Sequence, residues 1–485
     1  PLTPAMRMVF EIDSLANATP ATVSRAGILF INESDIGFRP FIDSFVQTRT
    51  NAIEKAHLPL LFSKYVQPCL DLMKKEYDDV VPLRAMSKVY TLCYLLQAQL
   101  DNSNAEKFTQ SSIEKMFVYS MIWSFGGPLP QDKVNNFRRN FSRMWLDTFK
   151  DVILPLKEGQ SVFDIYYDCE ADTFSSWEEL CPEYIPPSEL NFSKVVVQTA
   201  ETTALTHATK LLAGVGRPVM LVGGAGTGKT TILQDFLAHL ESNSWMQYNI
   251  AMNFYTDSKS LQAQLENPID KRSGHTFGPP SGRKLVYFVD DLNLPYVETY
   301  GTQNSLSLMR QLIDHGNFFD RIDLGFRTKV VDVQFVTAMN PTAGSFTISD
   351  RLQRQFSTFA CMMPSQSDLR TIYHSILDGH LEAFEPRISG LTSALVDSTV
   401  NITKSVQSSF LPSAIKFTYN WNMRELSNVV QGLCRADPGS YTEPLDMVRL
   451  WYHECNRVFK DRMVAALDLS RFEEQLLDVG KKFFS

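Results

Sequence analysis

The sequence lacks the features that define several classes of protein. It has no run of about eighteen apolar residues and no signal peptide at its start, so it predicts neither a membrane-spanning helix nor secretion. Its seven cysteines are scattered and none is spaced as C-x-x-C, so neither a zinc site nor a disulfide framework is indicated. Lysine and arginine form no block, and a net charge of −8 argues against a nucleic-acid partner.

What the chain does have is enough apolar material for several packed units. At 485 residues it is long enough for about three or four domains, and 33 phenylalanines can help to fill their cores. The scattered cysteines favour a reducing compartment. Because the chain begins at Pro1 without methionine and stops inside a helix-like stretch at 472–484, we expect it to be a piece of a longer polypeptide.

The spacing of apolar residues changes along the chain. Residues 6–12 and 27–31 favour β-structure, whereas helical spacing prevails from 34 to about 150. Residues 155–192 are rich in proline, acids and aromatics, which is typical of a connector. Strands and helices then alternate up to residue 365, and the remainder is mostly helical. This order predicts an α/β domain with a parallel sheet, flanked by helical units.

A glycine-rich phosphate loop is the most specific motif in the chain. It follows an apolar run at 219–222 and precedes apolar residues at helical spacing between 232 and 240, which is the strand, loop and helix context of a P-loop. Glycines let the backbone approach phosphate oxygens without a Cβ clash. The loop and the residue after it are Gly223, Gly224, Ala225, Gly226, Thr227, Gly228, Lys229, Thr230 and Thr231.

Two side chains at the end of the loop point to a nucleotide with its metal. Lys229 would place its charge on the β- and γ-phosphates of ATP or ADP, and Thr230 would offer its hydroxyl to Mg²⁺. The alternative is a glycine turn that matches the motif by chance, which the agreement of strand, loop and helix disfavours.

A second apolar run, at 285–289, ends in the acids Asp290 and Asp291. It predicts a buried parallel strand that carries carboxylates to the C-terminal edge of the sheet. Asp290 would hold Mg²⁺ through a water molecule, and Asp291 stands where a water-activating carboxylate is needed. Such a run alone would be equally consistent with a strand that has no catalytic role, but its combination with a P-loop favours a catalytic site.

Polar side chains further along complete the candidate site. Asn340 follows a third strand, 333–338, and its amide would position the attacking water, although it would also serve to cap a turn before proline. Arg424, in the helical tail, would reach the γ-phosphate and couple nucleotide state to the angle of a lid; the alternative is a surface arginine. Arg25 and Arg354 occupy equivalent places in a weak internal repeat. Each would act as an arginine finger toward the nucleotide of a neighbouring module, or else form a structural salt bridge.

Together these motifs resemble an AAA+ ATPase, and the residues around them narrow the resemblance. Residues 288–295, 300–303 and 338–346 are similar to the third AAA+ module of axonemal dynein heavy chains. Residues 21–25 look like the close of the second module, and 450–462 like the lid of the third. The sequence at 340–346 most resembles that of outer-arm chains of the β type.

The resemblance implies a division of the chain into four parts. Residues 1–33 would end the large subdomain of the second module, and 34–190 would be its helical small subdomain and connector. Residues 191–365 would form the large α/β subdomain of the third module with the P-loop, and 366–485 its helical lid. The adenine would lie near Val196, and an insert at 277–280 would form a hairpin that packs on the ring.

The family also implies partners and a location. The parent would be a ring of six AAA+ modules that moves along microtubules, in the cytoplasm and cytoskeleton, at the axoneme of a cilium or flagellum. Other modules of the same heavy chain would be its neighbours. Microtubules would be reached only through a stalk, and intermediate and light chains only through a tail, both absent from this sequence. Neither nucleic acid nor a membrane is expected as a partner.

One departure from the AAA+ pattern bears on activity. Many AAA+ proteins place glutamate where this chain has Asp291, which is one methylene shorter, and a misplacement of about 1 Å can lower a rate about a hundredfold. The arginine finger for this P-loop would come from the next module, and such fingers contribute about 10³–10⁵ in rate. The sequence therefore predicts tight nucleotide binding and very slow hydrolysis.

Three functions remain open at this point. The chain would be a regulatory nucleotide-binding module of a motor ATPase, a structural module that holds ADP without turnover, or an unrelated P-loop enzyme such as a GTPase or small-molecule kinase. The last is disfavoured because Asn340 and Arg424 are present and a guanine-reading Asn-Lys-x-Asp motif is not.

Overall fold

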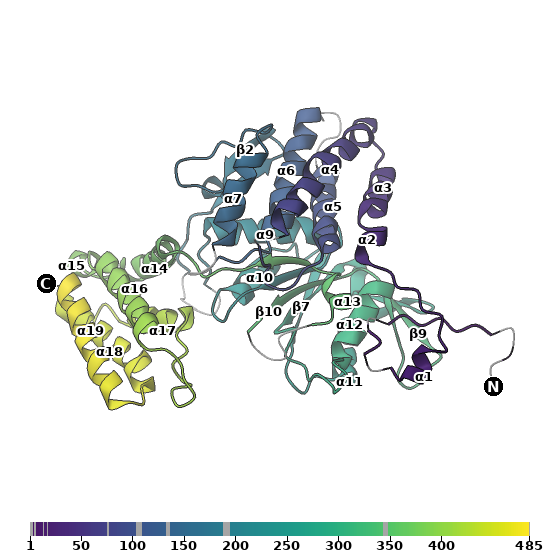
Figure 1. The fold of residues 1–485 in the computed structure, drawn as a ribbon. Coiled ribbons are helices and arrows are strands. Elements are labelled where there is room, and N and C mark those ends of the chain that lie inside the picture. Colours follow the sequence, from purple (N-terminus) through teal and green to yellow (C-terminus); the bar gives the residue numbers. More distant parts are fainter. Residues whose placement is uncertain are drawn as a thin grey trace.

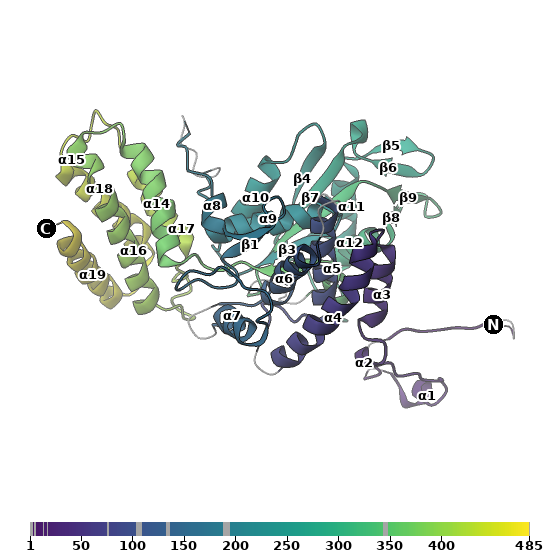
Figure 2. The same ribbon diagram turned by 90° about the horizontal axis from the view of Figure 1, so that it is seen from above.

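Three units follow one another in the computed structural model: a helical domain, an α/β domain and a second helical domain (Figure 1). A short N-terminal segment with α1 (Pro20–Val23) and α2 (Glu33–Ile36) precedes them. This segment and the C-terminal domain lie at opposite ends of the molecule (Figure 2). The structure describes residues 3, 6–12, 14–16, 18–74, 77–102, 109–131, 136–187, 195–342 and 348–484.

The first helical domain is built around α6, whose residues 116–126 are all buried. By contrast α7 is amphipathic, with Phe141 and Trp145, one turn apart, on its buried face. A two-stranded antiparallel sheet and a short helix close the domain. Its elements are α3 (Arg39–Thr48), α4 (Ala52–Met73), α5 (Ala85–Asn102), α6 (Gln110–Gly126), α7 (Phe137–Thr148), β1 (Ile165–Asp168), β2 (Thr173–Ser176) and α8 (Trp177–Leu180).

The α/β domain contains a five-stranded parallel sheet in the order β11-β3-β10-β7-β4. Every residue of β3 and β11 is buried, as expected for parallel strands covered on both faces. This confirms the predicted fold class. The elements are α9 (Ala200–Gly214), β3 (Val219–Val222), α10 (Lys229–Ala238), β4 (Trp245–Ala251), α11 (Ser258–Glu266), β7 (Lys284–Asp290), α12 (Asn304–His315), β10 (Val333–Met339), α13 (Asp350–Gln353) and β11 (Ser357–Ala360).

A second, four-stranded sheet projects from the α/β domain (Figure 2). A hairpin lies just before the expected position: β5 (Asp270–Ser273) pairs antiparallel with β6 (Thr276–Gly278), before the short helix η2 (Pro280–Gly282). Residues 277–280, where the hairpin was expected, cover only the end of β6 and the start of η2. Strand β6 then pairs with β9 (Arg327–Val330), and β9 pairs with β8 (Asn317–Phe319). The hairpin is therefore tied to the domain by a strand from a distant part of the sequence.

The C-terminal helical domain packs its helices around a core of its own, which includes Leu433 and Trp451. Helix α17 begins with a capping box in which Asn422 and Glu425 satisfy each other's backbone N–H groups. The elements are α14 (Gln366–Leu381), α15 (Pro386–Ser389), α16 (Thr392–Ser409), α17 (Met423–Leu433), α18 (Pro444–Val458), η3 (Lys460–Arg462) and α19 (Ala466–Phe484).

The β-structure predicted for residues 6–12 and 27–31 is wrong. In the described part of these stretches the chain forms no strand, and Val9 and Leu29 are 95% and 90% exposed. A strand needs a neighbour for its backbone N–H and C=O groups, and no described strand pairs with either stretch. Both stretches have the apolar spacing of a strand, but they have no sheet to join here.

The hydrophobic cores divide the molecule differently from the three units. One cluster joins the first helical domain to a face of the sheet and contains Trp123 and Phe163 together with Leu221 and Phe359. A polar contact across the same boundary runs from the Thr91 hydroxyl to that of Ser357, at 3.0 Å. The first helical domain and the α/β domain are therefore one packed body. Among the described residues, no helix has the length and apolar character needed to cross a membrane.

Candidate nucleotide-binding site

The glycine-rich loop connects β3 to α10 at the C-terminal edge of the sheet, as the sequence predicted. Strand β3 lies inside the sheet, between β11 and β10, so both neighbours end beside the loop. Gly226 and Gly228 have φ of +75° and +88°, a conformation that glycine adopts without a Cβ penalty. Gly228 is the N-cap residue directly before α10, so the loop ends at a helix N-terminus, where backbone N–H groups are free to bind an anion.

The start of the loop is held against the ends of β10 and β11. The N–H of Gly223 donates to the carbonyl of Met339 at 3.1 Å, and a Cβ at Gly223 would lie 2.2 Å from the carbonyl oxygen of Cys361. The Cys361 thiol donates to the carbonyl of Thr227 at 3.2 Å. Sequence reasoning did not single out Cys361, because its importance depends on which strand lies beside β3.

Lys229 lies over the loop that it follows. Its Nζ donates to the carbonyls of Gly223 at 2.8 Å and Gly224 at 2.7 Å. The side chain is buried, and this desolvation lowers the pKa of the ammonium from its usual value. The cation is thus placed within the loop itself, where a phosphate would meet it at short range.

Thr230 and Asp290 meet at the edge of the sheet. The Thr230 hydroxyl donates to Oδ2 of Asp290 at 3.0 Å, so the two predicted metal ligands are neighbours. Burial, and to a lesser degree the nearby charge of Asp291, raises the pKa of Asp290. Within the described residues no three His, Cys, Asp or Glu side chains gather as a metal-holding group. A divalent ion here would rely on these two side chains and on oxygens of the nucleotide.

Asp291 begins the turn after β7 and is exposed. Its φ of +54° is a left-handed conformation, which aspartate adopts more readily than most residues. Its N–H donates to Oδ1 of Asp290 at 3.1 Å, which links the two acids. The carboxylate therefore lies at the same sheet edge as the P-loop.

Asn340 follows β10, the strand beside β3, so the structure brings it to the edge where the P-loop lies. Its Oδ1 accepts bonds from the N–H of Thr342 at 3.1 Å and from the Thr342 hydroxyl at 2.8 Å. This is the turn-capping arrangement that the sequence predicted as the alternative to positioning water. Its backbone carbonyl accepts a bond from buried Asn293, a residue not anticipated, at 2.9 Å. Residues 343–346 of the same motif lie outside the described residues.

The C-terminal domain reaches the P-loop through the start of α17. Asn422 packs against Gly226, because a Cβ there would lie 2.7 Å from Asn422 Oδ1. The same oxygen accepts a bond from the N–H of Arg424 at 2.8 Å. The charge of Arg424 is close enough to help lower the pKa of Lys229, although burial is the main cause. Arg424 is therefore brought to the site, and Asn422 is a contact that sequence reasoning missed.

Val196 belongs to the extended segment before α9. The next residue, Val197, is buried in the core of the C-terminal domain. Two residues on, the Gln198 amide donates to Asp235 on α10. Val196 thus lies where the α/β domain, the P-loop helix and the C-terminal domain meet. The predicted domain start at residue 191 falls outside the described residues.

Arg25 and Arg354 are not gathered at this P-loop. Arg25 is exposed and belongs to the N-terminal segment. This segment, which contains α1, lies at the end of the molecule away from the C-terminal domain (Figure 1). Arg354, at the end of α13, lies 3.8 Å from Asp314 of α12, which is the salt bridge that the sequence kept as an alternative. An action on a neighbouring module's nucleotide stays a prediction for both.

Comparison with known proteins agrees with this geometry. The model of the P-loop containing dynein motor region matches residues 184–364, that of the dynein heavy chain AAA lid domain matches 58–179, and that of the AAA+ lid domain matches 395–485. These three ranges contain the P-loop, the helices before it and the helices after it.

Curated relatives align along the whole chain. It is 44% identical over 487 residues to the ciliary dynein beta chain of Tripneustes gratilla. It is 40% identical over 489 residues to the flagellar outer arm dynein beta chain of Chlamydomonas reinhardtii, and 39% over 487 residues to dynein axonemal heavy chain 9 of Homo sapiens. Each alignment covers 100% of this chain but 11% of the relative. The chain belongs to the dynein heavy chain family and carries its nucleotide-binding P-loop motor region between two AAA lid domains.

Proposed function

We propose that the chain is the third AAA+ module of an axonemal dynein heavy chain, joined to the end of the second, and that it binds ATP or ADP to regulate the motor. In this proposal residues 1–33 and 34–190 belong to the second module, and 191–365 and 366–485 form the third. The names of the matched relatives, which are ciliary, flagellar and axonemal chains, support the placement in an axoneme.

The contact between Asn422 and Gly226 carries the proposal of regulation. The C-terminal domain has its own core, yet it rests the first turn of α17 on the P-loop. A phosphate bound by the loop would lie close to this contact, and we expect its presence to change the position that the domain prefers. Arg424 in the same turn would add a guanidinium to the γ-phosphate and make that preference differ between ATP and ADP.

The remaining predicted residues complete a nucleotide site. Lys229 would neutralise the β- and γ-phosphates, and Thr230 and Asp290 would hold Mg²⁺. Asn340 would orient water through the amide nitrogen, since its oxygen is engaged by Thr342. Adenine would lie near Val196, between the two domains that meet there.

Hydrolysis is proposed to be slow. Asp291 has a shorter reach than glutamate, and an arginine finger would have to come from another module, as Arg25 and Arg354 would for modules upstream. The neighbours in this proposal are other AAA+ modules of the same heavy chain. Contact with microtubules and with intermediate and light chains would be made by a stalk and a tail elsewhere in the heavy chain.

A titration with fluorescent ADP and Mg²⁺ tests nucleotide binding. We expect saturable binding, with affinity about a hundredfold lower in Lys229→Ala, because two charge-assisted hydrogen bonds to phosphate are lost. Lys210→Ala, an exposed lysine on α9, is the matched control and should bind as the unchanged chain does. The proposal is wrong if the unchanged chain does not bind, or if Lys229→Ala binds equally well.

The rate of nucleotide release separates the regulatory role from a structural one. Release of ADP over seconds supports a switch, whereas release over hours supports a module that holds ADP as part of its core. A steady-state hydrolysis rate near the typical kinase floor of about 1 s⁻¹, abolished by Lys229→Ala, would contradict slow turnover. An unrelated GTPase or small-molecule kinase no longer needs to be considered, because the family is known.

A further inference from the structure

A single buried arginine joins the first helical domain to the strand beside the P-loop and to the start of α9. Arg138 lies on α7, and its side chain is 7% exposed. Its Nη2 donates to the carbonyl of Ala360, the last residue of β11, at 2.8 Å, and to the carbonyl of Gly127 at 3.2 Å. Its Nη1 donates to Glu201, in the first turn of α9, at 2.8 Å. One guanidinium therefore connects three separate segments.

The contact at Ala360 continues directly into the P-loop. The next residue is Cys361, whose carbonyl stands against Gly223 and whose thiol donates to the carbonyl of Thr227. The N–H of Cys361 donates to the carbonyl of Val222, at the end of β3, at 2.7 Å. A shift of Ala360 by a few tenths of an ångström would move the wall against which the loop is built.

The contact at Glu201 reaches the start of α9. Helix α9 begins at Ala200, directly after the extended segment that contains Val196. Arg138 thus holds the strand beside the phosphate loop and also the helix that anchors the segment near the expected adenine. Both anchors are set from the helical domain that precedes the α/β domain in the chain.

The surrounding contacts make this link stiff. The N–H of Ala360 donates to the carbonyl of Gly127 at 2.9 Å, so β11 has its outer edge covered by the helical domain. A Cβ at Gly127 would lie 2.7 Å from the ring of Phe359. The Arg138 guanidinium also lies 5.3 Å from the centre of the Phe163 ring. A change in the position of α7 cannot be absorbed here without moving β11.

We propose that Arg138 is a positioning residue for nucleotide binding, through which the helical domain of one module sets the shape of the P-loop of the next. This inference rests on the proposed nucleotide binding and adds to it a regulatory path from the preceding helices. By reciprocity, nucleotide in the loop also stabilises the position of α7.

Arg138→Met tests the proposal, since it keeps much of the side-chain length but removes every donor. We expect the dissociation constant for fluorescent ADP to rise about tenfold, which corresponds to about 1.4 kcal/mol. Arg138→Lys keeps the charge but lacks the forked guanidinium that spans Glu201 and Ala360. Its dissociation constant should therefore lie between those of the unchanged chain and Arg138→Met. Arg139→Met, the exposed neighbour on α7, is the matched control and should stay within about twofold.

The titration separates affinity from folding. A purely structural role lowers the number of binding sites per chain and leaves the dissociation constant of the remaining sites unchanged, which would overturn the inference. If the unchanged chain binds no ADP, it is the proposed function that fails. If Arg138→Met does not fold, hydrogen exchange on the unchanged chain decides. ADP should then slow exchange in α7 but not in α4 of the same domain, and an equal response of the two helices overturns the proposal.

Discussion

The contact between Gly226 and Asn422 gives a prediction that three matched glycines can test. Gly226 combines a left-handed φ of +75° with a Cβ position 2.7 Å from Asn422 Oδ1. Gly228 has a φ of +88° but nothing within 4 Å of that position. Gly224 has no positive φ, and its nearest neighbour would be Thr227 at 3.9 Å. Alanine at these positions therefore imposes both strain and clash, strain alone, or neither.

The structure sets the size of each effect. A left-handed alanine costs about 1–2 kcal/mol, so Gly228→Ala should lower the population of the binding-competent loop and weaken ADP binding about 5- to 30-fold. Gly226→Ala adds a steric conflict worth about 1–3 kcal/mol, for a total of about 2–5 kcal/mol. Gly224→Ala should bind ADP within about twofold of the unchanged chain.

Asn422→Ala isolates the contact between the domains. In that background the side-chain atoms at 2.7 and 3.0 Å are removed, and only the Cβ of residue 422, at 3.2 Å, remains near the new methyl group. Most of the clash is therefore relieved, and Gly226→Ala should weaken binding little more than Gly228→Ala does. Titration of fluorescent ADP into the six chains provides the double-mutant cycle. If Gly226→Ala has the same effect with and without Asn422, the first turn of α17 does not press on the P-loop, and the argument for regulation by the C-terminal domain is refuted.

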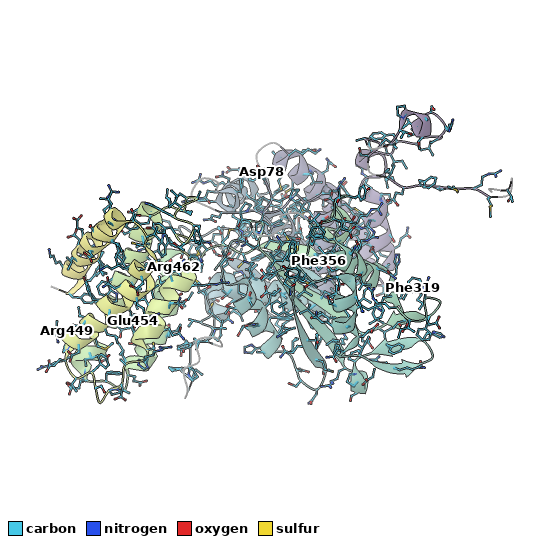
Figure 3. All side chains as sticks on the ribbon, turned by 90° about the horizontal axis from the view of Figure 1, so that it is seen from below. Asp78, Phe319, Phe356, Arg449, Glu454 and Arg462 are labelled. Atoms are coloured by element: carbon cyan, nitrogen blue, oxygen red, sulfur yellow. The ribbon has the colours of Figure 1, made fainter. Side chains whose placement is uncertain are left out.

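Three further predictions follow from the site and its supports. Arg462 pairs with buried Glu425 at the start of α17 and lies nearer the α/β domain than Arg449 does (Figure 3). Arg462→Met should lower the stability of the C-terminal domain by about 2 kcal/mol in calorimetry, which is less than for a fully buried pair because Arg462 is partly exposed. The exposed control Arg449→Met should change the stability little, and equal effects of the two variants would contradict this role. The pKa of Asp290 is raised above its unfolded value, so its ionised form opposes folding; the contribution that favours the fold is present at acidic pH and is lost as pH rises through the raised pKa. Asp290→Asn should therefore have a higher melting temperature than the unchanged chain near neutral pH, and this difference should shrink on acidification. The variant should also lose the effect of Mg²⁺ on ATP affinity. A difference in melting temperature that does not depend on pH would rule out this cause. Asp291→Glu should raise single-turnover hydrolysis about 10- to 100-fold, whereas Asp291→Asn should lower it, and a rate unchanged by glutamate would show that reach is not limiting.

Features governed by neighbouring residues in the chain were predicted well. The strand before Gly223, the helix after Gly228 and the acid-ended strand at Asp290 each depend on a short local pattern. Their meeting at one sheet edge follows from the parallel topology, since the C-terminal ends of parallel strands share an edge. Fold class and the approximate place of the site were therefore accessible from the sequence.

Features that depend on packing between distant segments were not predicted. The contacts that bring Cys361, Asn422 and Arg138 to the site carry no local signal, because they reach the P-loop, β11 and α9 across at least 60 residues of chain. The capping box of Asn422 with Glu425 is a local pattern, but it predicts a helix start and not a contact with Gly226. The apolar runs near Val9 and Leu29 had the right pattern for strands, but a strand forms only where a partner strand is available. Local patterning alone cannot supply either kind of information.

The continuous core beneath β11 has a practical consequence for dissecting this protein. A truncated chain that starts at the P-loop domain would lack the helices that cover Phe359 and Leu221, and a large apolar surface would be exposed to solvent. Such a fragment should aggregate during purification. Removing the last helical domain instead leaves that core intact, so a recombinant fragment cut near residue 365 is the better-behaved reagent.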